Sequence, residues 1–190
     1  MSEKAYHHGN LRNLMIEKTI EMIVDEGIGS MSMRKLAAAC GVSHSAPYAH
    51  FASKDELFAA VVEHITEQFA AVLKQAVAGL EATPEGLRHM GVAYVMFFAK
   101  NPQYYHFIFS HSGIKVGTGH IYEPYDLFMD FMNKFFESQN YPSELRKKTL
   151  IASWSRIHGL AGLSVMSKGG QVEGWEEMVL DILTNNYFIN

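Results

Sequence analysis

Residues 27–54 contain basic side chains and several serines and histidines, but no Asp or Glu. Arg34, Lys35 and Lys54 give this window a charge of +3, and His44 and His50 can add to it. Such a local excess of positive charge is suited to binding the phosphates of a nucleic acid, although the whole chain carries a net charge of −4. A chance absence of acidic residues would give the same composition. The predicted secondary structure must therefore decide between nucleic-acid binding and chance.

Helices are predicted to position these side chains. Apolar residues at three- and four-residue steps between Leu11 and Val24 predict an amphipathic helix that stops at Gly27. Ser32 can cap a second helix ended by Gly41, and Ser43 can cap a third, short one. Two short helices joined by a tight turn that contains glycine form a helix-turn-helix unit. The charged window therefore coincides with a predicted helix-turn-helix.

The remainder of the chain also has helical periodicity. Ser53 and Glu56 form a capping-box pattern that opens a long helix to about Val77. The pairs Thr83-Pro84 and Asn101-Pro102 each read as an N-cap followed by proline at the first helical position. We therefore expect an all-α protein of about nine helices, with a helix-turn-helix domain at residues 1–55 and a helical domain at 56–190. Further helices are expected at 121–139, 143–167 and 174–188.

Pro47 lies inside the third short helix, where its missing N–H would have bonded the Ser43 carbonyl. Proline also disfavours helical geometry at the residue before it. We therefore expect a loosened or 3₁₀-like start to this helix. If Pro47 and Phe51 point inward, the helical repeat of 100° per residue directs Ser45 and Ala49 outward.

Two stretches resemble a known family. The pattern Y-x-H-F-x-S-K-x-E-L, from Tyr48 to Leu57, resembles the amino-terminal domain of the TetR family of bacterial transcription regulators, and the match runs from about His8 to Phe58. The spacing of Trp154, His158 and Gly159 resembles the TetR regulators with a tryptophan-histidine-glycine (WHG) type carboxy-terminal domain.

This resemblance implies DNA contacts for a specific set of side chains. The family places phosphate contacts at Ser32, Tyr48, His50 and Lys54, and base reading at the start of the third helix. His50 could instead be a buried turn residue, whereas Lys54 has no evident structural role in the sequence. Few of these side chains can make bidentate base contacts, so we expect His44, Arg34 and DNA shape to carry much of the discrimination. The complete set is Ser32, Arg34, Ser43, His44, Ser45, Ala46, Tyr48, His50 and Lys54.

The resemblance also implies a homodimer that binds a palindromic operator in double-stranded DNA. Two recognition helices must reach successive major grooves, about 34–36 Å apart, and this supports a dimer independently. The family forms the dimer through its last two long helices, here 143–167 and 174–188. The alternative is that their apolar face covers the core of its own subunit. That face comprises Leu145, Leu150, Trp154, Ile157 and Leu160, with Ala152, Gly159, Ala161 and Gly162 allowing close approach.

Aromatic residues between 94 and 136 suggest an adaptable apolar pocket for an unknown small-molecule effector, itself uncharged or aromatic. The alternative is that these side chains are ordinary core. His106, His111 and His120 fit no compact metal site, and we expect neither a metal nor a cofactor. The predicted pocket residues are Tyr94, Phe97, Phe98, His106, Phe107, Tyr122, Tyr125, Phe128, Trp154 and His158.

Composition and motifs narrow the class of protein. No apolar run approaches the roughly 20 residues of a membrane span, and the amino terminus has no signal core, so we expect a cytoplasmic protein without a membrane partner. No nucleophile elbow, phosphate-binding lysine loop or zinc-protease motif is present, so no enzyme is expected. The favoured hypothesis is a ligand-controlled transcriptional repressor. The alternatives are a DNA-bound adaptor that recruits a protein partner and, more remotely, a helical enzyme with an inert helix-turn-helix.

Overall fold

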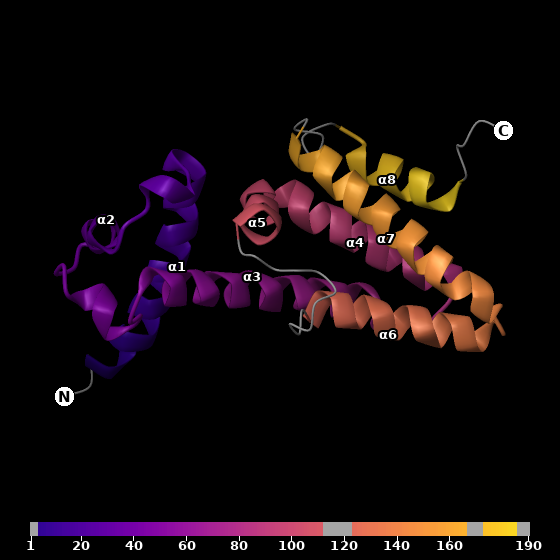
Figure 1. Ribbon diagram of the computed structural model, residues 1–190, viewed down its shortest axis with the longest axis horizontal. Helices are drawn as coiled ribbons and strands as arrows, with labels where there is room; N and C mark the ends of the chain where they lie inside the picture. Colours follow the sequence, from indigo (N-terminus) through magenta and orange to yellow (C-terminus); the bar gives the residue numbers. More distant parts are fainter. Residues whose placement is uncertain (1–3, 112–122, 167–172, 186–190) are drawn as a thin grey trace. The chain divides into compact units, whose positions relative to one another are not determined.

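The computed structural model describes residues 4–111, 123–166 and 173–185. These residues form eight α-helices and no strand, which confirms the all-α prediction (Figure 1). A 3₁₀ turn takes the place of the third of the nine expected helices. The α-helices are α1 Lys4–Glu26, α2 Met33–Ala39, α3 Lys54–Ala76, α4 Pro84–Lys100, α5 Pro102–His106, α6 Glu123–Ser138, α7 Ser143–Met166 and α8 Trp175–Thr184. Two 3₁₀ turns, η1 Ile28–Ser30 and η2 Ala46–Ala49, and a π-helical turn, Phe107–His111, complete them.

The chain forms two compact units that divide within α3. The first unit comprises Met1–Ile65 and His106–Gly113, and the second comprises Thr66–Tyr105 and Ile114–Asn190. The sequence analysis put the boundary after residue 55, at the start of α3. The first turns of α3 belong to the first unit because they pack there: His64 pairs with Glu17 of α1 at 2.7 Å, and the Phe58 ring meets the Phe107 ring edge-on.

Hydrogen bonds at the helix ends follow from the local sequence. The Ser32 hydroxyl accepts from the Lys35 N–H at 3.2 Å, and the Ser53 hydroxyl accepts from the Glu56 N–H at 3.1 Å. The Glu56 carboxylate in turn accepts from the Ala52 N–H at 2.6 Å, one residue before the usual capping-box donor. The predicted starts of α2 and α3 are confirmed. Each cap satisfies backbone donors that the helix itself leaves without a partner.

The segment after α2 differs from its prediction. Only η2 forms there, with N–H groups bonding carbonyls three residues back, as from Tyr48 to Ser45 at 3.1 Å. The Ser43 hydroxyl meets the Ser45 hydroxyl at 3.2 Å and caps no helix, so the Ser43 cap was wrong. Pro47 and Phe51 are buried, and the tight turn suits a proline that has no N–H to donate. The 3₁₀ geometry was expected only at the start of a helix, but it extends over the whole of η2.

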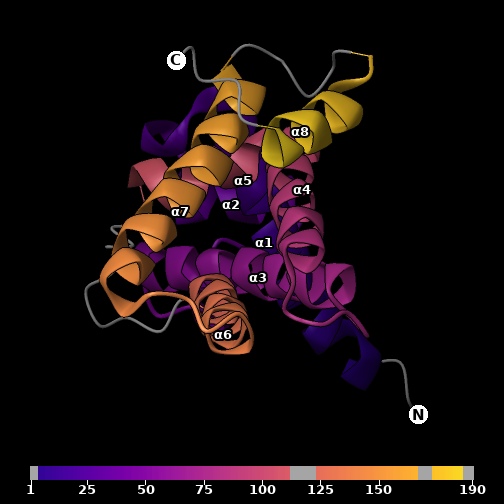
Figure 2. The same ribbon diagram turned by 90° about the vertical axis from the view of Figure 1, so that its right-hand side faces the viewer.

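An aromatic core organises the second unit. The Phe69 ring of α3 lies within 5.0 Å, centroid to centroid, of the Tyr94, Phe97 and Phe98 rings of α4. α4 packs in turn against α7 and α8 (Figure 2). Gly91 allows this approach, because a Cβ atom there would lie 2.8 Å from a methyl of Leu183 in α8.

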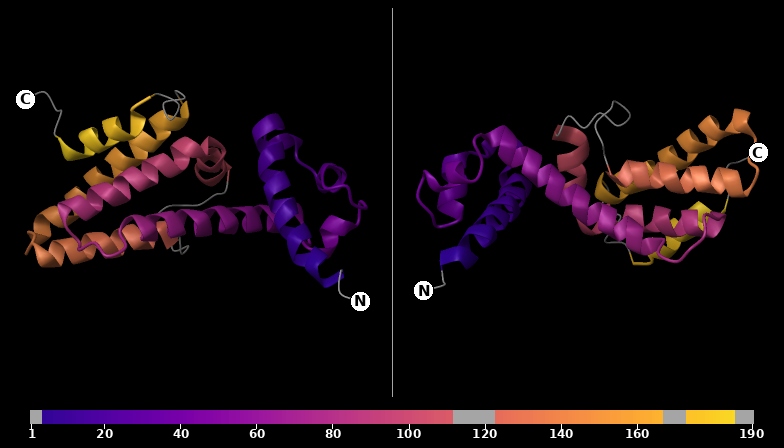
Figure 3. Two further views of the ribbon diagram at one scale, coloured as in Figure 1. Left: turned by 180° about the vertical axis from the view of Figure 1, so that it is seen from behind. Right: turned by 90° about the horizontal axis from the view of Figure 1, so that it is seen from below.

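Helix α6 closes the other side of the second unit. It starts beside the last turns of α3 (Figure 3), where the Lys74 ammonium pairs with the Glu123 carboxylate. Its apolar side chains at every third or fourth position, among them Phe128, Met132 and Phe136, are buried. This spacing places one face of α6 against the core.

Candidate nucleic-acid interface

The predicted DNA-contacting residues all lie in the first unit, on α2, η2 and the segments beside them. Ala46, His50 and Lys54 are half-buried, and the Tyr48 side chain is 58% exposed. The exposed side chains therefore gather on the helix-turn-helix segment, while its buried side supplies the small core of Leu36, Ala37 and Phe51. The remaining exposed members of the set are Ser32, Arg34, Ser43, His44 and Ser45.

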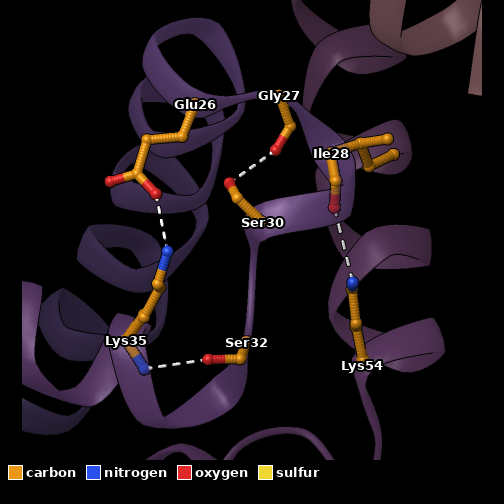
Figure 4. A network of polar contacts seen from close by, with 7 residues as sticks. All are labelled: Glu26, Gly27, Ile28, Ser30, Ser32, Lys35 and Lys54. Atoms are coloured by element: carbon orange, nitrogen blue, oxygen red, sulfur yellow. Dashed lines mark hydrogen bonds and ion pairs between the residues drawn. The ribbon is translucent and has the colours of Figure 1, made fainter.

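A polar network holds the start of α2 (Figure 4). The Lys35 ammonium pairs with the Glu26 carboxylate at 2.7 Å, and the Ser30 hydroxyl donates to the Gly27 carbonyl at 2.8 Å. The hydrogen bond and charge of Lys35 lower the pKa of Glu26. Glu26 thus neutralises Lys35, and Arg34 is the cation of α2 that no described carboxylate pairs with. Arg34 is left available for an external anion.

Lys54 has structural contacts that its sequence context did not suggest. Its ammonium donates to the Ile28 carbonyl at 3.4 Å (Figure 4) and lies 5.1 Å from the centroid of the Phe58 ring. As the first residue of α3, Lys54 ties η1 to that helix and also adds positive charge at a helix N-terminus, where anions are favoured. The interpretation that Lys54 has no structural role was wrong.

The turn η2 lies beside a buried aromatic ring. The Phe51 ring below it is 1% exposed and carries the Arg12 guanidinium 5.2 Å from its centroid. The His50 ring tilts against the same phenyl ring at 6.5 Å. Ser45 and Ala49 are exposed, as the helical repeat predicted. Tyr48 and Ala49 of η2, with Ser45 before it, are therefore exposed beside a buried proline and phenylalanine.

Comparison with known proteins identifies this unit. Residues 15–61 match the model described as bacterial regulatory proteins, tetR family. This segment, which holds α2 and η2, is therefore similar to the corresponding segment of tetR-family regulators. A TetR-like transcriptional regulator from Rhodococcus sp. RHA1 shares the fold over 91% of this chain and 91% of its own, with a TM-score of 0.65 and 18% identity.

Two relatives match part of this chain. The HTH-type transcriptional regulator MT0489 of Mycobacterium tuberculosis, itself described as uncharacterized, is 32% identical over 111 residues, which are 56% of this chain and 45% of the relative. The HTH-type transcriptional activator FasR of Mycolicibacterium smegmatis is 30% identical over 98 residues, or 52% and 45% of the two chains. The chain thus spans less than half the length of these relatives. Both relatives are described as transcriptional regulators of the HTH type.

The aromatic residues expected to form an effector pocket are distributed over both units. Tyr94, Phe97 and Phe98 are buried in the aromatic core of the second unit, whereas His106 and Phe107 belong to the first unit. Tyr122 lies outside the described residues. The rings of Tyr125, Phe128 and Trp154 pack together, with centroids 5.4 and 5.5 Å from that of Trp154. These contacts favour the alternative that most of the set is core.

His158 occupies the centre of a tyrosine and tryptophan cluster. The Tyr94 hydroxyl lies 3.0 Å from Nδ1, and the Tyr105 hydroxyl lies 3.3 Å from Nε2. The imidazole also stacks on the Trp154 ring at an interplanar angle of 8°. A neutral imidazole has one donor and one acceptor nitrogen, and tyrosine hydroxyls can satisfy both. Both ring nitrogens of His158 therefore have a hydroxyl partner, and burial lowers the pKa of this histidine.

We predict that the folded protein loses stability as pH falls from 7 towards 5, and that His158 contributes to this loss. Its pKa is lower in the folded chain than in the unfolded chain, so the unfolded state binds more protons in that window. The contribution is complete above the unfolded pKa of about 6.5 and declines below it. Urea unfolding of the wild type and of His158→Gln at several pH values tests this. A His158→Gln variant with the same pH slope as the wild type would contradict it.

Helix α7 directs its predicted dimer face inward. Ile157, Leu160, Ala161 and Gly162 are buried within the second unit, and a Cβ atom at Gly162 would lie 3.1 Å from the Tyr105 hydroxyl. The assignment of these residues to the dimer face was therefore wrong, because they pack against α4 and α5 of their own chain. The opposite face of α7 is exposed.

A cavity of about 340 Å³ lies among α4, α6, α7 and α8 in the second unit. Of the predicted pocket residues whose side chains are described, Phe128 alone lines it. Sequence reasoning missed Arg88 and Arg156 because single arginines on separate helices have no distinguishing spacing. The polar lining of this cavity consists of Arg88, Tyr141, Thr149, Ser153, Arg156 and Thr184.

Neither a cluster of metal ligands nor a membrane-spanning helix occurs in the part of the chain that the structure describes. No three His, Cys, Asp or Glu side chains gather there in a geometry that could hold a metal ion. None of the helices there is long and apolar enough to cross a bilayer.

Proposed function

We propose that this protein is a transcriptional regulator of the tetR family that binds a palindromic operator as a homodimer. The observation that carries the proposal is the exposed side of the helix-turn-helix segment. Arg34 of α2, Tyr48 of η2 and the flanking serines Ser32, Ser43 and Ser45 are exposed there, above a buried base. Positive charge and hydroxyls position a protein on phosphates, while base edges specify sequence. The family match over residues 15–61 supports the same assignment.

In this proposal, few side chains contact the edges of the DNA bases. The exposed residues of η2 and the turn before it, Ser43–Ser45 and Tyr48, offer hydroxyls and one imidazole but no guanidinium or amide. Bidentate contacts to guanine or adenine need Arg, Lys, Asn or Gln. Arg34 and His44, together with DNA shape, would then supply most of the discrimination between sequences.

The exposed face of α7 supplies the proposed dimer contact. Ile151 is 57% exposed and Met166 is 81% exposed, and Ala152, Ser155 and Gly159 between them are exposed as well. A Cβ atom at Gly159 would meet nothing within 4 Å in its own chain. Small residues between large apolar ones allow a second helix to approach closely, and exposed apolar patches are typical of protein interfaces.

The proposal includes a small-molecule effector whose binding causes the protein to dissociate from the operator. The cavity of the second unit provides room for it, and this favours a ligand-controlled repressor over an adaptor that senses no ligand. FasR is described as an activator, so the direction of control needs its own measurement. A reporter gene behind the selected operator, with and without the protein, distinguishes repression from activation.

The direct test is selection of bound sequences from random DNA with the purified full chain, followed by titration of the selected site at several salt concentrations. A regulator should enrich an inverted repeat and lose affinity steeply with salt, since phosphate contacts release counterions. Enrichment of no sequence, with affinity equal to that for random DNA, would refute the proposal.

Arg34→Ala is expected to lower operator affinity by about 1–3 kcal/mol and to relax the preference at the base pairs it contacts. Lys134→Ala is the matched control, because it removes one positive charge from the exposed surface of α6 in the second unit. The measurement is a fluorescence-anisotropy titration with the selected site and its single-base variants. Equal losses in the two variants would show that Arg34 contributes only net charge.

A further inference from the structure

We propose that the cavity of the second unit binds an amphipathic monoanion, a small carboxylate with an aliphatic or aromatic body. This deepens the proposed function, and depends on it only for the step from ligand binding to operator release. The sequence suggested an uncharged effector instead. The charged residues that line the cavity lie on helices far apart in the chain, so the sequence did not show that they come together.

Two guanidinium groups line the cavity, and no Asp or Glu does. Arg88 of α4 is half-buried, and no described carboxylate pairs with it. Burying a cation without a partner carries a desolvation cost that an anion in the cavity would offset. Arg88 is therefore the expected carboxylate partner.

Arg156 is held in place by backbone groups. Its guanidinium donates to the carbonyls of Ile182 and Asn185, at the C-terminal end of α8. Carbonyls at a helix C-terminus stabilise a cation without cancelling its charge. Arg156 therefore keeps its charge beside the cavity and links the cavity wall to the end of α8.

Hydroxyl groups complete the polar side. Ser153 and Thr149 of α7 line the cavity, and the Tyr141 hydroxyl lies 2.9 Å from that of Thr149. Hydroxyls donate to carboxylates, and charge-assisted hydrogen bonds of this kind are the strong ones. One carboxylate can thus be held by a guanidinium and by hydroxyls at once.

The rest of the lining is apolar. Leu87 of α4, Phe128, Met132 and Phe135 of α6 and Leu183 of α8 face the same space. The volume of about 340 Å³ is at the small end of the range for small-molecule sites. A ligand with a short aliphatic chain or one aromatic ring, and a single carboxylate, matches both the size and the two-sided chemistry.

The test is calorimetric titration of the full chain, without DNA, using octanoate and 4-phenylbutyrate beside 1-octanol and 4-phenyl-1-butanol. At least one acid is expected to bind about tenfold or more tightly than its alcohol, as a charge-assisted contact requires. Arg88→Met should remove this preference and leave the alcohol unaffected, while Arg88→Lys should retain part of it. Lys147→Met, on the exposed surface of α7 outside the lining, is the control with equal charge.

Three results would overturn the inference: neither acid binds, each acid binds no better than its alcohol, or Lys147→Met has the same effect as Arg88→Met. Ser153→Phe tests the location without removing a charge, because its ring should fill the cavity and abolish binding of acid and alcohol alike. Octanoate binding to Ser153→Phe at the wild-type affinity would place the ligand elsewhere and refute the site.

A separate operator titration with saturating acid distinguishes this inference from the proposed function. Selective acid binding that leaves operator affinity unchanged supports the carboxylate site and refutes ligand control. Operator binding by a protein that binds neither acid refutes the carboxylate site and supports the DNA-binding function.

Discussion

Ile151→Glu is expected to convert the protein to a monomer and to lower its operator affinity by about 10²–10⁴-fold, the gain that bivalent binding normally provides. Ile151 is 57% exposed on the outer face of α7, so the substitution removes little from the core of its own chain. In a dimer, however, two glutamates would enter an apolar interface without partners, and buried unpaired charges are strongly unfavourable.

Sedimentation velocity and an operator titration at fixed salt concentration measure the two effects of Ile151→Glu. The matched control is Val72→Glu, which places the same charge at an exposed valine of α3. Thermal unfolding of the dissociated Ile151→Glu chain should show a folded protein, since exposed substitutions usually change stability by only about 0.5 kcal/mol. If Ile151→Glu sediments as a dimer with wild-type operator affinity, the outer face of α7 is not the dimer contact.

Phe51→Ala is expected to destabilise the first unit by about 3–5 kcal/mol and to abolish operator binding, because truncation of a buried phenylalanine leaves a cavity. The ring is 1% exposed, and the Phe51 N–H donates to the Pro47 carbonyl at 2.9 Å. Its loss removes the base on which η2 rests and the surface against which Arg12 packs.

Hydrogen exchange measures the effect of Phe51→Ala locally, since the two compact units can respond differently. Amides of α2 should exchange much faster in the variant than in the wild type, while those of α4 should be little changed. Phe51→Leu is the control and should retain most of the stability, because it keeps an apolar side chain in the site. Wild-type exchange in α2 of Phe51→Ala would contradict the role of this ring.

The short-range features of this protein were determined by the sequence itself. Ser32, Ser53 and Thr83 cap the helices that their positions predicted, with each hydroxyl accepting from an N–H three residues on. Periodic apolar residues likewise predicted the all-α fold and most helix bounds. These features depend on interactions within about four residues of the chain, so a single stretch of sequence contains all the information that they need.

The faces and sites of the second unit were decided by tertiary structure alone. The sequence showed an apolar side of α7 but not whether it faced its own core or a second chain; packing against α4 turns Ile157 and Leu160 inward and leaves Ile151 outside. The same packing brings Arg88 and Arg156 to one cavity, although 68 residues separate them in sequence. Helical periodicity defines which residues share a face, whereas the partner of that face depends on contacts between distant segments, which no local pattern encodes.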